Sequence, residues 1–160
     1  MPNVRPTSIN AASIAAALAA RPQLWRPFVR YDAESRYYAR LASEPHYEAW
    51  LLTWLPGQGT DWHDHGGSAG AFTVVQGELT ERYANKAPGG TIRIRPGATR
   101  LATGKVRPFG VRHIHRVTND GVLPAVSLHV YAPALLQMHA YAAQGEVLEL
   151  VTAQLAGVNW

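Results

Sequence analysis

Hydrophobic residues change their spacing along the chain near residue 36, which divides it into a helical and a β-rich part. Before that point, Ile9–Ala20 is a run of strong helix formers that follows the capping residues Thr7-Ser8 and ends at Arg21-Pro22. Leu24–Tyr31 is a candidate for a second, shorter helix. We therefore predict that residues 1–35 form a helical N-terminal cap.

From residue 36 onward, short runs rich in Val, Thr, Tyr, Trp and Ile alternate with turns marked by Gly and Pro. Residues 91–95 alternate with period two, and so do residues 125–131, which predicts two strands. Gln144-Gly145 is predicted to be the turn between the last two strands. Short strands at this spacing are typical of an antiparallel barrel or sandwich. The prediction is one mainly β domain over residues 1–160, with a small antiparallel β-barrel at 36–160.

Composition excludes several classes of protein. The chain has 160 residues, 47% of them hydrophobic, which is enough for one domain with a real core. It has no apolar run of about eighteen residues and no apolar signal segment, so we expect a cytoplasmic protein without a membrane partner. The absence of cysteine excludes disulfides, Cys zinc ligands and Cys nucleophiles. Lys and Arg are scattered singly despite a net charge of +4, so we expect no nucleic-acid partner. We also expect a monomer.

His63 and His65 are the first candidates for metal ligands. Two His separated by one residue project from the same face of a strand, whereas on a helix they would not face a common point. The β-rich segments on both sides favour the strand. His115 is a candidate for the third ligand, and His113 is its rival, two residues away on the same strand face. Three His in the mouth of a barrel suit zinc with one water, whereas iron(II) usually takes two His and one carboxylate.

The spacing around these His residues resembles the two sequence motifs of cupin barrels. Five residues separate Gly57 from His63, and eleven residues separate His65 from Gly77, as in the first cupin motif. The second motif centres on a His with an Asn four positions further on, as in His115-Arg116-Val117-Thr118-Asn119. The resemblance implies a cupin, or small jelly-roll barrel, and it favours His115 over His113 as the third ligand.

One position departs from the first cupin motif. That motif normally carries a Glu five residues after its second His, and here the position is Gly70. The site would then consist of three neutral imidazoles, and a bound divalent ion would keep its full charge. Such a site favours anionic ligands, including a thiolate.

Within the cupins, the chain resembles the cysteine dioxygenases, which oxidise the thiol of cysteine to a sulfinate with iron(II) and dioxygen. Four segments between residues 38 and 133 carry this resemblance: Tyr38-Ala39-Arg40, Trp54 with residues 57–65, Gln76-Gly77-Glu78-Leu79, and His115-Arg116-Val117 with residues 124–133. The segment Pro-Ala-Val-Ser-Leu-His-Val-Tyr within the last of these is the most specific.

The resemblance implies a role for each residue that matches a family motif. The iron(II) ligands would be His63, His65 and His115. The arginine that binds the substrate carboxylate would be Arg40, with Tyr38 as its neighbouring tyrosine. The hydrogen-bonded row that ends at the active-site tyrosine would be Ser127, His129 and Tyr131. An Arg suits a carboxylate because it forms two parallel charge-assisted hydrogen bonds. Mammalian members crosslink a cysteine to the tyrosine. That cysteine position is Gly70 here, so Tyr131 should be an unmodified phenol, as in the bacterial members that commonly have Gly there.

The implied reaction is the oxidation of a small thiol, L-cysteine, by dioxygen. The nearest alternative is a 3-mercaptopropionate dioxygenase, which usually has Gln in place of Arg40 and a carboxylate-binding Arg beyond the Ser-His-Tyr row. Residues 132–141 contain no Arg, which favours cysteine. An alternative of another class is a non-catalytic metal- or sugar-binding cupin, which would need neither Arg40 nor the row. A zinc hydrolase is a third option, and the lack of a Glu base beside the ligands speaks against it.

Overall fold

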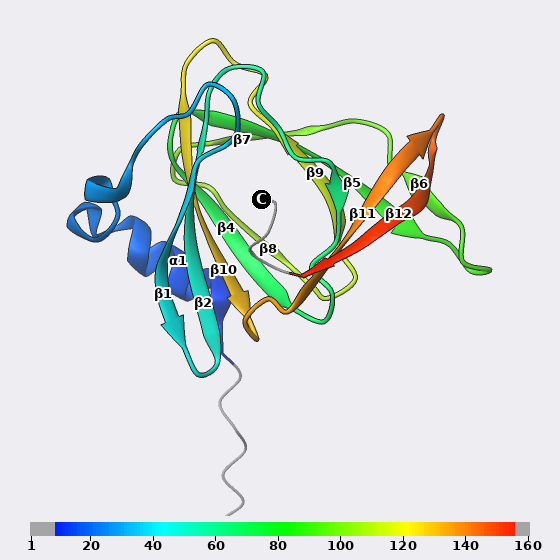
Figure 1. Cartoon of the computed structure of the whole chain (residues 1–160), viewed down its shortest axis with the longest axis horizontal. Helices are drawn as coiled ribbons and strands as arrows, with labels where there is room; N and C mark the ends of the chain where they lie inside the picture. Colours follow the sequence, from blue (N-terminus) through cyan, green and yellow to red (C-terminus); the bar gives the residue numbers. More distant parts are fainter. Residues whose placement is uncertain (1–8, 156–160) are drawn as a thin grey trace, which may run out of the picture.

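Two antiparallel sheets face each other in the computed structural model, which describes residues 9–155 (Figure 1). The first sheet has the order β1-β2-β10-β4-β8, formed by Tyr38–Glu44, Tyr47–Trp54, Ala125–Ala132, Ala69–Gln76 and Val106–Phe109. The second has the order β6-β12-β11-β3-β9-β5-β7, formed by Ile92–Ile94, Val147–Leu155, Gln137–Gln144, Trp62–His63, Ile114–Thr118, Glu78–Lys86 and Thr99–Ala102. This architecture confirms the predicted mainly β fold, including the strands at residues 91–95 and 125–131 and the turn at Gln144-Gly145.

The N-terminal helix begins slightly later than predicted. Helix α1 spans Ala11–Ala19, and the side chain of Asn10 accepts a hydrogen bond from the backbone N–H of Ser13 at 3.1 Å. Asn10 is therefore the N-cap residue. The predicted cap, Thr7-Ser8, lies outside the described residues.

The predicted second helix is wrong as a continuous helix. Two single-turn 3-10 helices, η1 (Pro22–Leu24) and η2 (Arg26–Phe28), occupy the region instead. Pro27 lacks the backbone N–H that an α-helix through this segment would need, and its ring disfavours helical geometry at the preceding residue. A single Pro therefore divides the segment into short turns.

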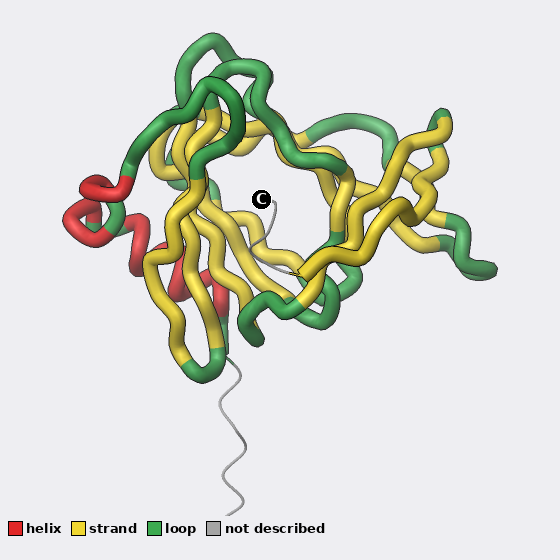
Figure 2. The backbone as a smooth tube through the Cα atoms, in the orientation of Figure 1, coloured by secondary structure: helices red, strands yellow, loops and turns green. Residues whose placement is uncertain are grey.

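The helices cover the outer face of the first sheet (Figure 2). Ala15 of α1 packs against Ala49, Ala71 and Val130, and Trp25 packs against a neighbouring apolar cluster that includes Leu128. Because side chains alternate along a strand, residues 126, 128 and 130 of β10 face the helices, and Ser127, His129 and Tyr131 face the space between the sheets. Both faces of β10 are buried, so its polar row lies inside the protein.

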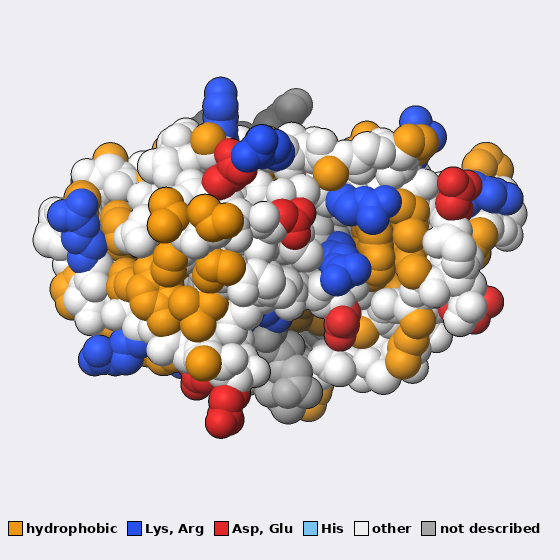
Figure 3. Space-filling view, turned by 90° about the horizontal axis from the view of Figure 1, so that it is seen from above, with side chains coloured by type: hydrophobic (Ala, Val, Ile, Leu, Met, Phe, Trp, Pro, Cys, Tyr) orange, Lys and Arg blue, Asp and Glu red, His pale blue; other side chains and the backbone are white. Residues whose placement is uncertain are grey.

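Within residues 9–155, no helix is long and apolar enough to cross a membrane. Lys and Arg side chains lie singly or in small groups over the face in Figure 3, between apolar and uncharged side chains. That face carries no continuous basic patch.

Candidate metal centre

The pairing of two short strands brings His63 and His115 together. β3 lies beside β9, and His63 is the direct antiparallel partner of His115. Their Nε2 atoms are 3.1 Å apart. β3 ends at His63, so His65 follows the strand instead of lying within it, unlike the predicted strand through both residues. One nitrogen atom from each of His63, His65 and His115 nevertheless lies within 4.8 Å of the others.

Hydrogen bonds fix which nitrogen of each ring faces its neighbour. The Nδ1–H of His63 donates to the carbonyl of Asp61 at 2.9 Å, and the Nδ1–H of His115 donates to Glu81 at 2.8 Å. In a neutral ring the proton is then on Nδ1, so the two Nε2 lone pairs point toward each other. Two lone pairs at 3.1 Å repel unless a cation lies between them. With metal–nitrogen bonds of about 2.1 Å, this separation corresponds to an angle of about 95° at one ion.

The His rings of this triad are held in the neutral form that binds metals. Burial, and then the neighbouring His115, lowers the pKa of His63 and of His65 well below the usual value. His65 is almost fully buried, and its ring stacks on Phe109 with centroids 4.5 Å apart. Among the described residues, Nδ1 of His65 has no hydrogen-bond partner. Three neutral imidazoles with unshared lone pairs fit a divalent ion.

The missing carboxylate of the first cupin motif has a steric explanation. A Cβ atom added at Gly70 would collide with the backbone carbonyl oxygen of Val130 and would lie 2.7 Å from Cζ of Phe109, which leaves no room for any side chain. Phe109, on β8, therefore occupies the space that a side chain at residue 70 would need. The triad cannot gain a carboxylate ligand from this position.

His113, the rival third ligand, belongs to a different cluster. Its Nε2–H donates to Glu81 at 2.8 Å, and it lies just before β9 instead of on it. The same Glu81 oxygen accepts from His115, and the second Glu81 oxygen accepts from Nε of Arg107 at 2.6 Å. Burial alone would raise the pKa of Glu81, but hydrogen bonds from His113, His115 and Arg107 lower it well below its usual range. The structure thus brings His115, and not His113, to the triad.

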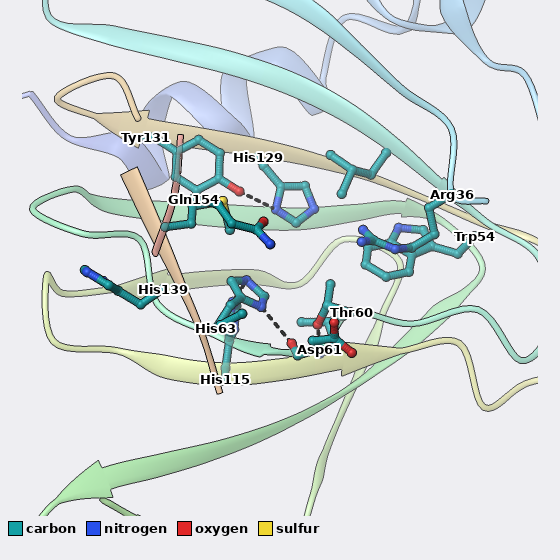
Figure 4. A pocket seen from close by; sticks show the side chains of 14 residues that line it. Arg36, Trp54, Thr60, Asp61, His63, His115, His129, Tyr131, His139 and Gln154 are labelled. Carbon is teal, nitrogen blue, oxygen red and sulfur yellow. Dashed lines mark hydrogen bonds between the residues drawn. The ribbon is translucent and has the colours of Figure 1, made fainter. Parts of the chain in front are cut away.

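His63 and His115 of the triad form part of the wall of a cavity of about 260 Å³ between the two sheets, and His65 lies behind that wall (Figure 4). Both sheets contribute lining side chains, and a few more come from loops. The lining residues are Arg36, Leu52, Trp54, Thr60, Asp61, His63, His115, Val117, His129, Tyr131, Met138, His139, Ala140 and Gln154. His129 and Tyr131 lie on the wall opposite His63 and His115. A small molecule in this space would contact His63 and His115 on one side and β10 on the other.

The polar row of β10 forms a directed chain of hydrogen bonds. Nε1–H of Trp54 can only donate, and it donates to Oγ of Ser127 at 2.9 Å. The buried Ser127 hydroxyl then donates to Nε2 of His129 at 2.8 Å, which leaves the ring proton on Nδ1. That Nδ1–H faces the oxygen of Tyr131 at 3.5 Å, a long contact. In this arrangement the Tyr131 hydroxyl accepts from His129 and acts as a donor itself. Burial raises the pKa of Tyr131, so it stays protonated.

Comparison with known proteins identifies the family. A family model described as cysteine dioxygenase type I matches residues 4–144, which is most of the chain. The chain belongs to the cysteine dioxygenase type I family. The zebrafish (Danio rerio) protein named cysteine dioxygenase type 1 is 29% identical to this family member over 121 residues, covering 70% of the chain. The match spans only 58% of the zebrafish protein's length.

Solved structures agree with the fold of this family member. A Klebsiella pneumoniae protein with a double-stranded β-helix domain matches with a TM-score of 0.57 and 20% identity, covering 68% of this chain and 85% of that one. A cupin superfamily protein from Desulfitobacterium hafniense matches with a TM-score of 0.52 and 14% identity, covering 82% and 94%. At these identities the likeness shows the cupin fold alone. The chain is therefore a cysteine dioxygenase-type cupin with a three-His potential metal site.

The arginine that lines the cavity of this family member is Arg36, which sequence motifs did not point to. Its guanidinium lies 5.0 Å from the centre of the Trp54 ring. Among the described residues it forms no hydrogen bond and no ion pair. Burial lowers the pKa of Arg36 to about 10, and the neighbouring Tyr131 and Asp61 offset only part of that effect. A desolvated cation of this kind is stabilised by an anion that enters the cavity.

Arg40 and Tyr38, the predicted carboxylate-binding pair, are not among the residues that line the cavity. Arg40 is exposed, pairs with Trp50 in the β1–β2 register, and has its guanidinium 5.7 Å from that ring. Tyr38 packs edge-on against the same ring at 5.9 Å. Arg40 is on β1, whereas Arg36 lies two residues before it, and four residues of extended chain span about 13 Å. Motif matching alone therefore could not choose between them.

Two residues of the cupin motifs hold the chain around the triad in place. Asp64 turns away from the cavity and accepts hydrogen bonds from Nδ1–H of His139 at 2.8 Å and from the Tyr141 hydroxyl at 2.7 Å. Both donors are on β11, so Asp64 fastens the His63-to-His65 segment to that strand. The buried amide of Asn119 donates to the carbonyls of Trp54 and Leu123. These contacts explain why the two positions are polar without a direct role in the triad.

Proposed function

We propose that this cupin is an iron(II)-dependent thiol dioxygenase that oxidises L-cysteine with dioxygen to cysteine sulfinic acid. The observation that carries the proposal is a cavity that two imidazoles of the three-His site line together with Arg36, a guanidinium without an ion pair among residues 9–155, in a member of the cysteine dioxygenase type I family. A deprotonated cysteine has two anionic groups, a thiolate and a carboxylate. The thiolate suits the ion and the carboxylate suits the guanidinium.

His63, His65 and His115 would hold the iron. When bound, iron(II) supplies positions for the thiolate and for dioxygen, so that both oxygen atoms reach sulfur and give the sulfinate. Zinc also accepts three His, and family membership is what supports iron over zinc.

The other cavity residues would orient the substrate and exclude water. Arg36 would hold the carboxylate in two parallel hydrogen bonds, which fixes the thiol end toward the triad. Tyr131 would donate a hydrogen bond to substrate or oxygen from the opposite wall, oriented through His129 and Ser127. Leu52 and Val117 add apolar surface to the cavity wall. The motif-based assignment of the carboxylate to Arg40 stays a prediction. We further propose that the protein acts as a monomer in the cytoplasm.

The proposal is tested by oxygen consumption of iron-loaded protein offered L-cysteine, 3-mercaptopropionate or cysteamine, with the sulfinate product identified by mass spectrometry. We expect L-cysteine to be preferred to cysteamine by ten-fold or more, on the scale of a charge-assisted hydrogen bond of roughly 1.5–3 kcal/mol. If 3-mercaptopropionate is the best substrate, the protein is the related dioxygenase instead. If no thiol causes oxygen uptake although iron is bound, the protein is a non-catalytic metal-binding cupin.

Tyr131→Phe should lower turnover of L-cysteine about ten- to a hundred-fold, the scale of a lost hydrogen-bonding or acid–base group. The aromatic ring stays and only the hydroxyl is lost, so the packing of this buried residue should not change. Iron content per chain should equal that of the wild type, because Tyr131 is not among the triad. The purified protein should also migrate as one band on a denaturing gel, because the chain has no cysteine for a crosslink. Wild-type turnover in Tyr131→Phe would remove the residue from the mechanism.

A further inference from the structure

Glu81 is a fully buried carboxylate that does not belong to the triad. Its side chain is 1% exposed and lies on β5, beside β9. One oxygen accepts from His113 and His115, each at 2.8 Å, and the other accepts from Arg107 at 2.6 Å. A carboxylate this deeply buried is costly without partners, and here three donors satisfy it. It therefore has a defined orientation with respect to His115.

The contact with His115 determines how that ring faces the triad. Because Nδ1–H of His115 donates to Glu81, the lone pair is on Nε2, and Nε2 lies 3.1 Å from Nε2 of His63. A partner that donated to Nδ1 would put the proton on Nε2 and block the site. A carboxylate acceptor also increases the basicity of the ring and its donation to an ion.

The three-imidazole set contains no negative charge, and position 70 cannot supply any because the backbone carbonyl of Val130 and the ring of Phe109 leave no room for a side chain there. We propose that Glu81 is the positioning carboxylate of the metal centre, which fixes His115 as the Nδ1–H tautomer and places beside the site the negative charge that the ligands lack. His113 and Arg107 hold Glu81 in that position. The inference rests on the triad binding a metal, as the proposed function does, but not on the substrate or the reaction.

Glu81→Gln should weaken Fe²⁺ binding about ten- to a hundred-fold, which is the usual effect of losing the carboxylate that accepts a hydrogen bond from a metal-binding His. The measurement is anaerobic Fe²⁺ titration against a competing chelator. The reduction potential of the bound iron should also become more positive, because a neutral amide stabilises iron(III) less than a carboxylate does. A purely structural role for Glu81 would not move that potential in a folded protein.

Glu78→Gln is the matched control. Glu78 is on the same strand and binds Arg100 at the surface, but no His. Fe²⁺ affinity should be unchanged in this variant. Arg107→Gln is a second control, because it breaks the link from β5 to β8 and leaves both His contacts of Glu81. It should lower the melting temperature and should weaken Fe²⁺ binding less than Glu81→Gln does.

A measurement on the wild type makes the inference testable even if Glu81→Gln does not fold. In the Zn²⁺-loaded protein with ¹⁵N-labelled His, NMR should show a protonated Nδ1 and a metal-bound Nε2 for His115. An unprotonated or metal-bound Nδ1 would overturn the inference. So would equal Fe²⁺ affinity and potential in the folded Glu81→Gln variant. A wild type that binds no Fe²⁺ would contradict the proposed function itself.

Discussion

Replacing His63, His65 or His115 with Ala should abolish iron retention, whereas His113→Ala should retain iron. Each triad residue supplies one of only three imidazoles, so its loss leaves two ligands, too few for a stable site. His113 contacts the site through Glu81 and edge-on through the His115 ring, and Glu81 keeps its hydrogen bonds to His115 and Arg107 without it. Iron per chain after anaerobic loading and desalting, quantified by mass spectrometry, is the measurement.

The pair His113→Ala and His115→Ala is the critical comparison, because the two residues are neighbours that share one carboxylate. Melting temperatures of both variants without metal show whether each is folded. Full iron in His115→Ala together with loss of iron in His113→Ala would make His113 the third ligand. Loss of iron in both folded variants would mean that His113, although it is not one of the three ligands, is also needed for metal binding.

The sequence predicts the fold and the triad because both depend on local patterns. Alternation along residues 125–131 determines which side chains of β10 face inward, and the structure has Ser127, His129 and Tyr131 on that inner face. Two short motifs carry the triad: the spacing from Gly57 to Gly77, and His115 followed by Asn119. In a barrel, the strands that contain these motifs lie side by side, which brings their His side chains together. Contacts between residues fifty positions apart follow once β3 pairs with β9.

Glu81 could have been found from the sequence, whereas the choice between Arg36 and Arg40 could not. Leu79 is fully buried, and Glu81 lies two positions further along the same strand, so a charge on a buried face was detectable. Arg36 precedes β1 and Arg40 lies on it, and which one reaches the cavity depends on the β1–β2 register and on the length of the hairpin. Those are properties of long-range pairing, which the residues around each arginine do not encode.

Arg36→Gln should lower kcat/KM for L-cysteine about ten- to a hundred-fold, whereas Arg40→Gln should leave it nearly unchanged. A guanidinium–carboxylate contact inside a cavity is worth roughly 1.5–3 kcal/mol, and only Arg36 lines the cavity. Arg40 is exposed, lies only four residues further along the chain and does not line the cavity, which makes it a matched control. Steady-state kinetics by oxygen uptake, at equal iron content, is the measurement.

Two further arms separate carboxylate binding from general damage to the site. Cysteamine has no carboxylate, so Arg36→Gln should oxidise it about as fast as the wild type does. Arg36→Lys should recover only part of the lost activity on L-cysteine, because an ammonium keeps the charge but not the paired hydrogen bonds. Equal losses on L-cysteine and cysteamine would mean that Arg36 supports the cavity through its contact with Trp54 instead of binding substrate. A large loss in Arg40→Gln with full activity in Arg36→Gln would restore the assignment that the family motif implies, and would require β1 to present Arg40 to the cavity when substrate is bound.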